Sequence, residues 1–186
     1  MIQTEFLGGQ GLGNQLWVYA AARGISEHLA RAHVVTGRDM FKAHDVLELD
    51  WGDAEALNEG PIIPFHEELF YDTELGYFAS DFDARVTALP PRCRIDGLMQ
   101  SEDYFFGRLD DLSSWIRAAE PIRMRAEDFA DRVVLNLRGG EYKRHKNLVL
   151  PKTYWQHAMR HLTEMTGEDS FLVVTDDPAY ARAMFP

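Results

Sequence analysis

Two segments of the chain carry residues whose types and spacing suit a phosphorylated ligand. One is Gly8-Gly9-Gln10-Gly11-Leu12-Gly13, with four glycines in six residues, and the other is Arg138-Gly139-Gly140, after the apolar run Val133–Leu137. Glycines let the backbone approach a ligand closely and expose the free amides at the start of a helix. The planar guanidinium of an arginine can bind two phosphate oxygens at once. Both segments therefore favour an anion, and Arg138 favours a diphosphate.

The glycine run admits three interpretations from its residues. A Walker A phosphate loop is excluded, because Asn14-Gln15 stands where a Lys-Ser or Lys-Thr pair is needed. A dinucleotide-binding loop stays open, although Gly9, Gly11 and Gly13 give G-x-G-x-G in place of G-x-G-x-x-G. In that case Asp39 is placed to bind the ribose. A tight turn that needs glycine for positive φ is the third interpretation.

The charge of the chain limits the partners that it can bind. Its 186 residues carry a net charge of −11 at pH 7, with a pI near 5.0. An acidic protein repels nucleic acid and anionic membrane surfaces unless its charge is locally reversed, and nucleic acid is not expected as a partner. The charge reverses in one basic segment, made up of Arg138, Lys143, Arg144, His145 and Lys146. This segment suits a small, highly charged anion better than a polymer, and a solvated basic turn is the alternative.

The composition also limits the location and the cofactors. No apolar run approaches the ~20 residues of a transmembrane segment, and residues 1–5 lack the features of a secretory signal. Cys93 is the single cysteine, so neither an internal disulfide nor a zinc cluster is expected. We expect a cytoplasmic protein, with peripheral binding to a membrane left open, and no metal or other cofactor.

The elements that must position these residues alternate between strand and helix patterns. Strands are predicted at 2–7, 33–36, 93–98, 133–137 and 171–175, and helices at 14–31 and from 101, 151 and 179. Asn14 is the expected N-cap of the first helix. The inner face of the helix from 151 is expected to consist of Tyr154, Ala158, His161 and Leu162. Alternating strands and helices predict an α/β fold, which a hinge at 119–121 divides into domains 1–120 and 121–186.

Four segments resemble a known family in the same order along the chain. Residues 9–21, GQGLGNQLWVYAA, are similar to the G-G-L-G-N-Q-hydrophobic-aromatic-x-Y-A-A signature of bacterial α-1,2-fucosyltransferases, with one glutamine among the glycines. Residues 96–105, DGLMQSEDYF, resemble that family's G-[YF]-x-Q-S-E-x-Y-F, and residues 171–177, FLVVTDD, resemble its F-x-x-F-S-D-D. Residues 136–141, NLRGGE, stand where the family carries H-x-R-R-x-D. Four matches in one order are more specific than any one alone.

The arginine segment departs from the family pattern at three positions. Arg138 keeps the first arginine, whereas Gly139 replaces the second, Glu141 replaces the aspartate and Asn136 replaces the histidine. The loss of one arginine leaves the identity of the donor open.

The resemblance implies a GT-B-like fold, with one Rossmann-like amino-terminal domain for the acceptor and the first part of a second Rossmann-like domain for the donor. It implies a glycosyltransferase that moves a fucosyl or related residue from a GDP-sugar such as GDP-fucose to a hydroxyl of a glycan acceptor. The reaction would be an inverting, metal-independent displacement in the cleft between the domains. Because family members continue beyond the D-D strand, we expect an incomplete donor domain, an exposed apolar patch, self-association and little activity of this chain alone.

The resemblance also assigns the site residues. Arg138 is the expected catalytic residue, because it would neutralise charge on the departing diphosphate. The expected donor-binding residues are Arg138, Asn136, Gly140, Glu141 and Asp176. The expected loop facing the cleft consists of Gly11, Gly13, Asn14 and Gln15. Asp177 is as good a candidate for a helix N-cap as for a nucleotide contact. The candidates for the general base, by residue type only, are His66, Glu102 and Asp103.

Other functions stay open beside this one. A NAD(P)-binding Rossmann oxidoreductase would use the first glycine loop. A catalytically silent nucleotide-sugar-binding domain would bind GDP without transferring a sugar. A stable α/β domain with no surviving site would respond to no ligand.

Overall fold

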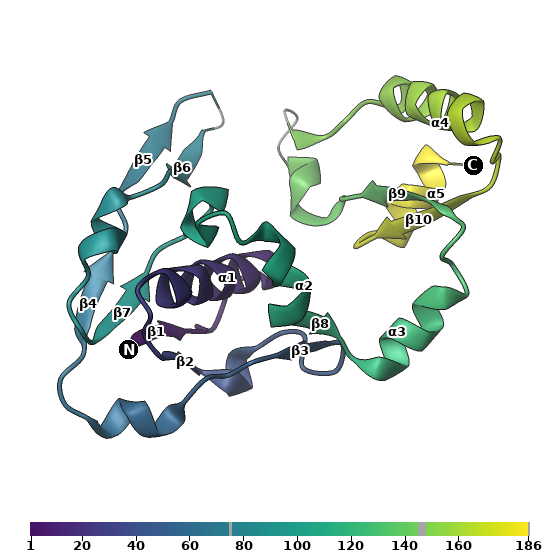
Figure 1. Cartoon of the computed structure of the whole chain (residues 1–186). Coiled ribbons are helices and arrows are strands. Elements are labelled where there is room, and N and C mark those ends of the chain that lie inside the picture. The colour runs from purple at the N-terminus through teal and green to yellow at the C-terminus, as the bar shows by residue number, and fades with distance from the viewer. Residues whose placement is uncertain (75, 145–147, 186) are drawn as a thin grey trace. The chain divides into compact units, whose positions relative to one another are not determined.

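The computed structural model describes residues 1–74, 76–144 and 148–185. The chain forms two compact units, Met1–Arg123 (unit 1) and Met124–Pro186 (unit 2). The boundary lies within helix α3 (Glu120–Glu127), next to the hinge predicted at 119–121. Strands and helices occur together in both units, so the prediction of a mixed α/β fold is confirmed (Figure 1).

A four-stranded parallel sheet forms the centre of unit 1, in the order β2-β1-β7-β4 (Figure 1). Its strands are β1 (Ile2–Glu5), β2 (His33–Thr36), β4 (Ile63–His66) and β7 (Cys93–Asp96). β2 has the predicted limits, whereas β1 and β7 each end earlier than predicted. β4 stands at the edge of the sheet. Pro64 has no amide hydrogen to donate, and an edge strand tolerates this because one side of it has no neighbouring strand.

Short elements connect these strands. β3 (Leu47–Leu49) pairs antiparallel with β8 (Ile116–Ala118), and β5 (Leu69–Asp72) pairs antiparallel with β6 (Tyr77–Ser80). The remaining pieces are α2 (Leu112–Trp115) and the 3-10 helices η1 (Arg38–Met40), η2 (Ala54–Asn58), η3 (Ala84–Ala88), η4 (Glu102–Phe105) and η5 (Leu109–Asp111). The helix predicted from residue 101 is therefore the short η4, with the Ser101 side chain accepting from an amide of its first turn.

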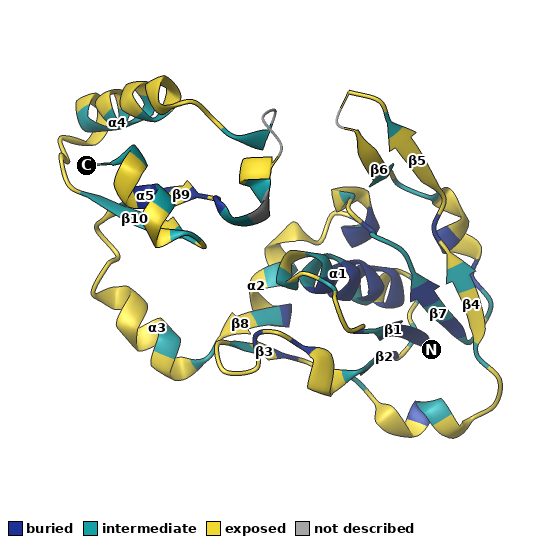
Figure 2. Ribbon diagram, turned by 180° about the vertical axis from the view of Figure 1, so that it is seen from behind, coloured by how far each residue is buried: buried dark blue, intermediate teal, exposed yellow. Residues whose placement is uncertain are grey.

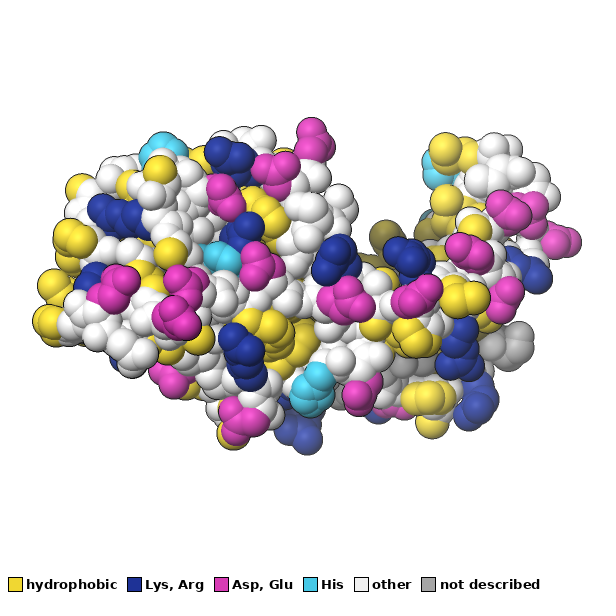
Figure 3. All heavy atoms as spheres, turned by 60° about the horizontal axis from the view of Figure 1, so that its bottom comes forward, with side chains coloured by type: hydrophobic (Ala, Val, Ile, Leu, Met, Phe, Trp, Pro, Cys, Tyr) yellow, Lys and Arg dark blue, Asp and Glu magenta, His cyan; other side chains and the backbone are white. Residues whose placement is uncertain are grey.

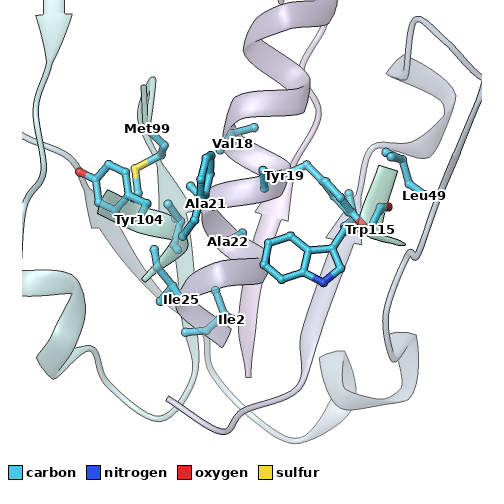
Figure 4. Close-up of a cluster of buried hydrophobic side chains, with 14 of the residues drawn as sticks. Ile2, Val18, Tyr19, Ala21, Ala22, Ile25, Leu49, Met99, Tyr104 and Trp115 are labelled. Atoms are coloured by element: carbon cyan, nitrogen blue, oxygen red, sulfur yellow. The ribbon is translucent and has the colours of Figure 1, made fainter. Parts of the chain in front are cut away.

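Helix α1 (Leu12–His28) connects β1 to β2 and packs against both strands. Val18, Ala22 and Ile25 on this helix are buried in the same cluster as Ile2 of β1 (Figure 4). Tyr19 is buried too, and its hydroxyl donates to the Trp115 carbonyl oxygen at 3.0 Å. Burial raises the pKa of this phenol to about 12. These contacts fix α1, and with it the glycine run, on the sheet.

Unit 2 contains the parallel strands β9 (Val133–Leu137) and β10 (Phe171–Thr175), which have the predicted limits. They are accompanied by η6 (Gly140–Arg144), α4 (Lys152–Thr166) and α5 (Pro178–Met184). Along β9 the side chains alternate: Leu135 and Leu137 are buried, whereas Val134 is half-exposed. Such alternation is typical of a sheet with one covered face.

Helix α4 covers only part of the face that the sequence predicts, since Ala158 and Leu162 are partly buried. Tyr154 and His161 are exposed, and Trp155 instead turns inward, with its ring 5.9 Å from that of Phe185. Most of α3 and α4 is exposed in Figure 2. Unit 2 also exposes several large apolar side chains: Met124, Phe129, Val134, Leu150, Tyr154, Met165 and Val174. Within the residues that the structure describes, no helix is both long enough and apolar enough to cross a membrane.

Candidate functional site

The arginine segment lies at the carboxyl ends of two parallel strands. Arg138 follows β9 directly, and Asp176 follows β10 directly. The Arg138 Nε lies 3.7 Å from Asp176 Oδ2, and its guanidinium lies over the Tyr142 ring, 4.8 Å from the centroid. The Arg138 side chain is half-exposed, at 54%. Asn136 is exposed and lies two residues before Arg138. Because side chains alternate along an extended strand, the two lie on the same face.

Gly139 and Gly140 are explained by packing against the two aspartates. A Cβ on Gly139 would lie 2.7 Å from the Asp177 Cβ, and a Cβ on Gly140 would lie 2.6 Å from Asp176 Oδ2. The Gly139 amide donates to Asp176 Oδ1 at 2.7 Å. The glycines therefore bring the loop after β9 against the end of β10, and Asp176 becomes a fixed part of this edge.

Asp177 has the helix-capping role that the sequence left open. Its Oδ1 accepts from the Tyr180 amide at 3.0 Å, which caps α5. Its Oδ2 pairs with the Lys143 ammonium, and this hydrogen bond, followed by that from Tyr180, lowers the pKa of the Asp177 carboxyl. Lys143 is thereby held at the same strand edge as Arg138.

Some of the expected donor-side residues fall outside what the structure describes. This applies to the side chain of Glu141 and to His145 and Lys146 of the basic segment. Arg144 is described and is exposed at the end of η6. The described cations of this edge are thus Arg138, Lys143 and Arg144. On the face drawn in Figure 3, basic side chains stand among acidic ones.

Helix α1 begins at Leu12, within the glycine run, whereas the sequence predicts a helix from residue 14. Gly11, and not Asn14, is the N-cap, with extended backbone angles and no side-chain hydrogen bond to the first turn. Asn14 lies within the first turn, and its Oδ1 accepts from the Gln100 Nε2 at 3.1 Å. This bond joins residues 9–21 to residues 96–105, which are far apart in the sequence.

The glycines of the run have different roles. Gly9 has a φ of +88°, which favours glycine and agrees with the tight-turn interpretation at this position. Gly11 and Gly13 have no such φ, and a Cβ on either would meet nothing within 4 Å. The backbone at these two positions is therefore open to a neighbour. Gly13 also borders an apolar hollow of about 340 Å³ between α1, η4 and α2.

Gln15 does not belong to a ligand-facing loop. Its side chain is fully buried, with its Nε2 donating to the Met40 carbonyl at 2.8 Å and its Oε1 accepting from the Lys42 amide at 3.0 Å. Both amide groups are used to hold the segment after β2. The prediction that Gln15 faces a cleft is wrong, because a buried amide must find its hydrogen bonds inside the fold.

A second polar group, missed from the sequence, lies at the carboxyl ends of three neighbouring strands of unit 1. We name Glu5, His66, Arg94 and Asp96 the strand-end cluster. Arg94 Nε lies 3.1 Å from Asp96 Oδ1, Arg94 Nη1 lies 3.5 Å from Glu5 Oε2, and His66 Nδ1 lies 3.6 Å from Asp96 Oδ2. Only His66 has a signal in the sequence, as a candidate base by type. The others become neighbours through the pairing of β1, β7 and β4.

Neither of the other candidate bases joins this cluster. Glu102 borders the apolar hollow beside Gly13, and Asp103 is exposed in η4. Among the described residues, no group of three or more His, Cys, Asp or Glu side chains is arranged to hold a metal ion. No protein-family model matches the chain, and neither a curated protein nor a solved structure matches it.

Proposed function

We propose that the chain is a glycosyltransferase of the GT-B type that moves a fucosyl or related sugar from a GDP-sugar to a hydroxyl of a glycan acceptor. Unit 2 would bind the donor and unit 1 the acceptor. The observation that carries the proposal is the placement of Arg138 and Lys143 at the carboxyl edge of the parallel pair β9–β10. Open α/β sheets bind their ligands at that edge.

Arg138 would act on the departing nucleotide. The acceptor oxygen attacks the anomeric carbon from the side opposite the diphosphate, and the electron pair of the broken bond leaves with GDP. A guanidinium on the diphosphate stabilises the charge that builds there in the transition state. Arg138 can supply two parallel N–H donors, and Lys143 can add a second positive charge. In this proposal the two cations, which pair with Asp176 and Asp177 in the structure, would turn to the leaving group and take the place of a metal.

The acceptor hydroxyl must lose a proton during the attack. A base within hydrogen-bond reach of that hydroxyl accelerates such a transfer. His66 lies at the carboxyl edge of the unit 1 sheet, with an Asp96 carboxylate oxygen 3.6 Å from its Nδ1, and this position supports it as the candidate. We therefore propose His66 as the base.

The test is ligand-induced stabilisation of the full chain by GDP, GDP-fucose, UDP and NAD. At a hundredfold excess over Kd, a ligand bound only to the folded state adds about 2.7 kcal/mol of stability. We expect GDP to stabilise the protein, Arg138→Ala to remove the effect, and Arg160→Ala, an exposed arginine of α4, to keep it. Stabilisation by UDP alone would refute the fucose assignment and keep the transferase proposal. GDP binding without transfer of labelled fucose, even in a completed chain, would support a catalytically silent domain.

A dinucleotide-binding function is favoured by one observation. The first turn of α1 has no side-chain cap, and the backbone at Gly11 and Gly13 is open, as a phosphate at a helix N-terminus requires. The same ligand series decides between the two functions. Stabilisation by NAD and not by GDP, kept in Arg138→Ala, would establish the alternative.

A further inference from the structure

A cavity of about 220 Å³ opens at the carboxyl ends of β1 and β7. Glu5 and Asp96 end these two strands, and Leu7 and Gln10 of the following loop also line the cavity. In the strand order β2-β1-β7-β4, the chain leaves β1 through α1 and returns to the sheet as β2, next to one edge of β1. The other edge of β1 pairs with β7. The boundary between β1 and β7 is thus the point where the strand order reverses. Open α/β sheets bind ligands in the crevice at such a point.

Arg94 holds the two carboxylates of this cavity in place. Its Nε and Nη2 donate to the two Asp96 oxygens at 3.1 and 3.2 Å, and its Nη1 lies 3.5 Å from a Glu5 oxygen. A carboxylate offers about four acceptor positions, so Glu5 and Asp96 keep lone pairs for further donors. All three side chains are about one-third exposed, which leaves these lone pairs within reach of a ligand.

The charge and the size of the cavity select the class of ligand. The cavity contains two carboxylates and one guanidinium, so the net charge of these three groups is negative. It therefore repels a phosphate and favours a ligand rich in hydroxyl donors. Leu7 is 52% exposed and offers an apolar surface to the C–H groups of such a ligand. The volume is below the ~300–1,000 Å³ of sites for drug-sized molecules, and it suits a single ring.

We propose that this cavity binds one neutral sugar ring, with Glu5 and Asp96 accepting hydrogen bonds from its hydroxyls and Arg94 holding both carboxylates in position. The inference rests on the proposed function and deepens it, because the sugar bound here would be the acceptor. His66, next to Asp96, would then lie beside the attacking hydroxyl.

The experiment is saturation-transfer NMR on the full chain with lactose, methyl β-galactoside and glucose at millimolar concentration, and with GDP as a separate ligand. We expect saturation transfer from the protein to at least one of the sugars. Asp96→Asn and Glu5→Gln should each weaken sugar binding about tenfold, which corresponds to ~1.4 kcal/mol. Asp110→Asn makes the same chemical change at an exposed position of unit 1 and should leave binding unchanged. Arg94→Lys should keep part of the binding that Arg94→Met loses.

The two proposals fail in different ways in this experiment. Arg138→Ala should remove saturation transfer to GDP and keep saturation transfer to the sugar. Asp96→Asn should weaken saturation transfer to the sugar and keep that to GDP. Sugar binding without GDP binding would support the cavity and refute the donor site. The cavity assignment is overturned if no sugar receives saturation, if both carboxyl variants bind as the wild type does, or if a nucleotide is the ligand lost in Asp96→Asn. Amide spectra of each variant establish that it is folded.

Discussion

The close backbone approach at Gly24, inside helix α1, gives a prediction whose sign depends on how α1 packs against η4. A Cβ added to Gly24 would lie 2.4 Å from the Tyr104 carbonyl oxygen and 2.9 Å from the Phe105 Cα. Ordinary contact begins at 3.4 Å, so the first distance is 1.0 Å too short. Both atoms belong to the backbone of η4 and cannot rotate away. Alanine at position 24 therefore forces α1 and η4 apart.

Two opposing effects set the magnitude. In a helix interior, alanine is more stable than glycine by ~1 kcal/mol, whereas overpacking a core costs ~1–3 kcal/mol. Because the obstacle at Gly24 is backbone, we take the upper part of that range and expect Gly24→Ala to lower the free energy of unfolding by about 1–2 kcal/mol. Gly13→Ala lies in the same helix with nothing within 4 Å of its Cβ, so it should raise stability by up to ~1 kcal/mol.

The assay is urea unfolding followed by tryptophan fluorescence. Trp17, Trp51 and Trp115 belong to unit 1 and only Trp155 to unit 2, so the signal reports mainly on unit 1. At unchanged m, the midpoint should fall for Gly24→Ala and stay or rise for Gly13→Ala. If Gly24→Ala were as stable as Gly13→Ala, the close packing of α1 on η4 would be wrong.

Three further predictions concern other parts of the chain. The buried Glu67 carboxylate accepts three hydrogen bonds at 2.8 Å, so Glu67→Gln should lower the free energy of unfolding in urea by at least ~2 kcal/mol. The same change at the exposed neighbour, Glu68→Gln, should cost less than ~0.5 kcal/mol, and equal costs would contradict this prediction. Burial raises the pKa of Cys93 from 9.0 to about 11, so with rising pH the unfolded chain loses this proton before the folded chain does. The free energy of unfolding should therefore fall between pH 9 and 11. If a Cys93→Ala variant lost stability with pH as steeply as the wild type, the assignment to Cys93 would be refuted. The half-exposed Val134 and Val174 should promote self-association, and the double change to threonine should reduce it in sedimentation velocity; unchanged association would show that another surface is responsible.

The strands with continuous β-branched or apolar runs could be predicted from the sequence. β2, β9 and β10 have the predicted limits, because each run stops at residues that favour a turn. The stretch from 39 to 89 gave no such signal. Its strands β3 to β6 are three or four residues long, and each depends on a partner for its stability.

The candidate site could be predicted only where it is local in the sequence. Arg138 and Asp176 follow strands that the sequence shows, so their place at a strand end could be predicted. Gln15 could not be assigned, since only the fold determines that its side chain points inward. The strand-end cluster could not be found either, because its residues meet only after β1, β4 and β7 have paired.

The central claim is that the edge of β9 and β10 binds the diphosphate of a GDP-sugar. The most direct measurement is a titration of the isotope-labelled full chain with GDP, followed through its backbone amide resonances. Our account predicts shifts at Arg138, Gly139, Gly140 and Asp176, which disappear in Arg138→Ala. Shifts confined to the glycine run before α1, or no shifts at all, would contradict it.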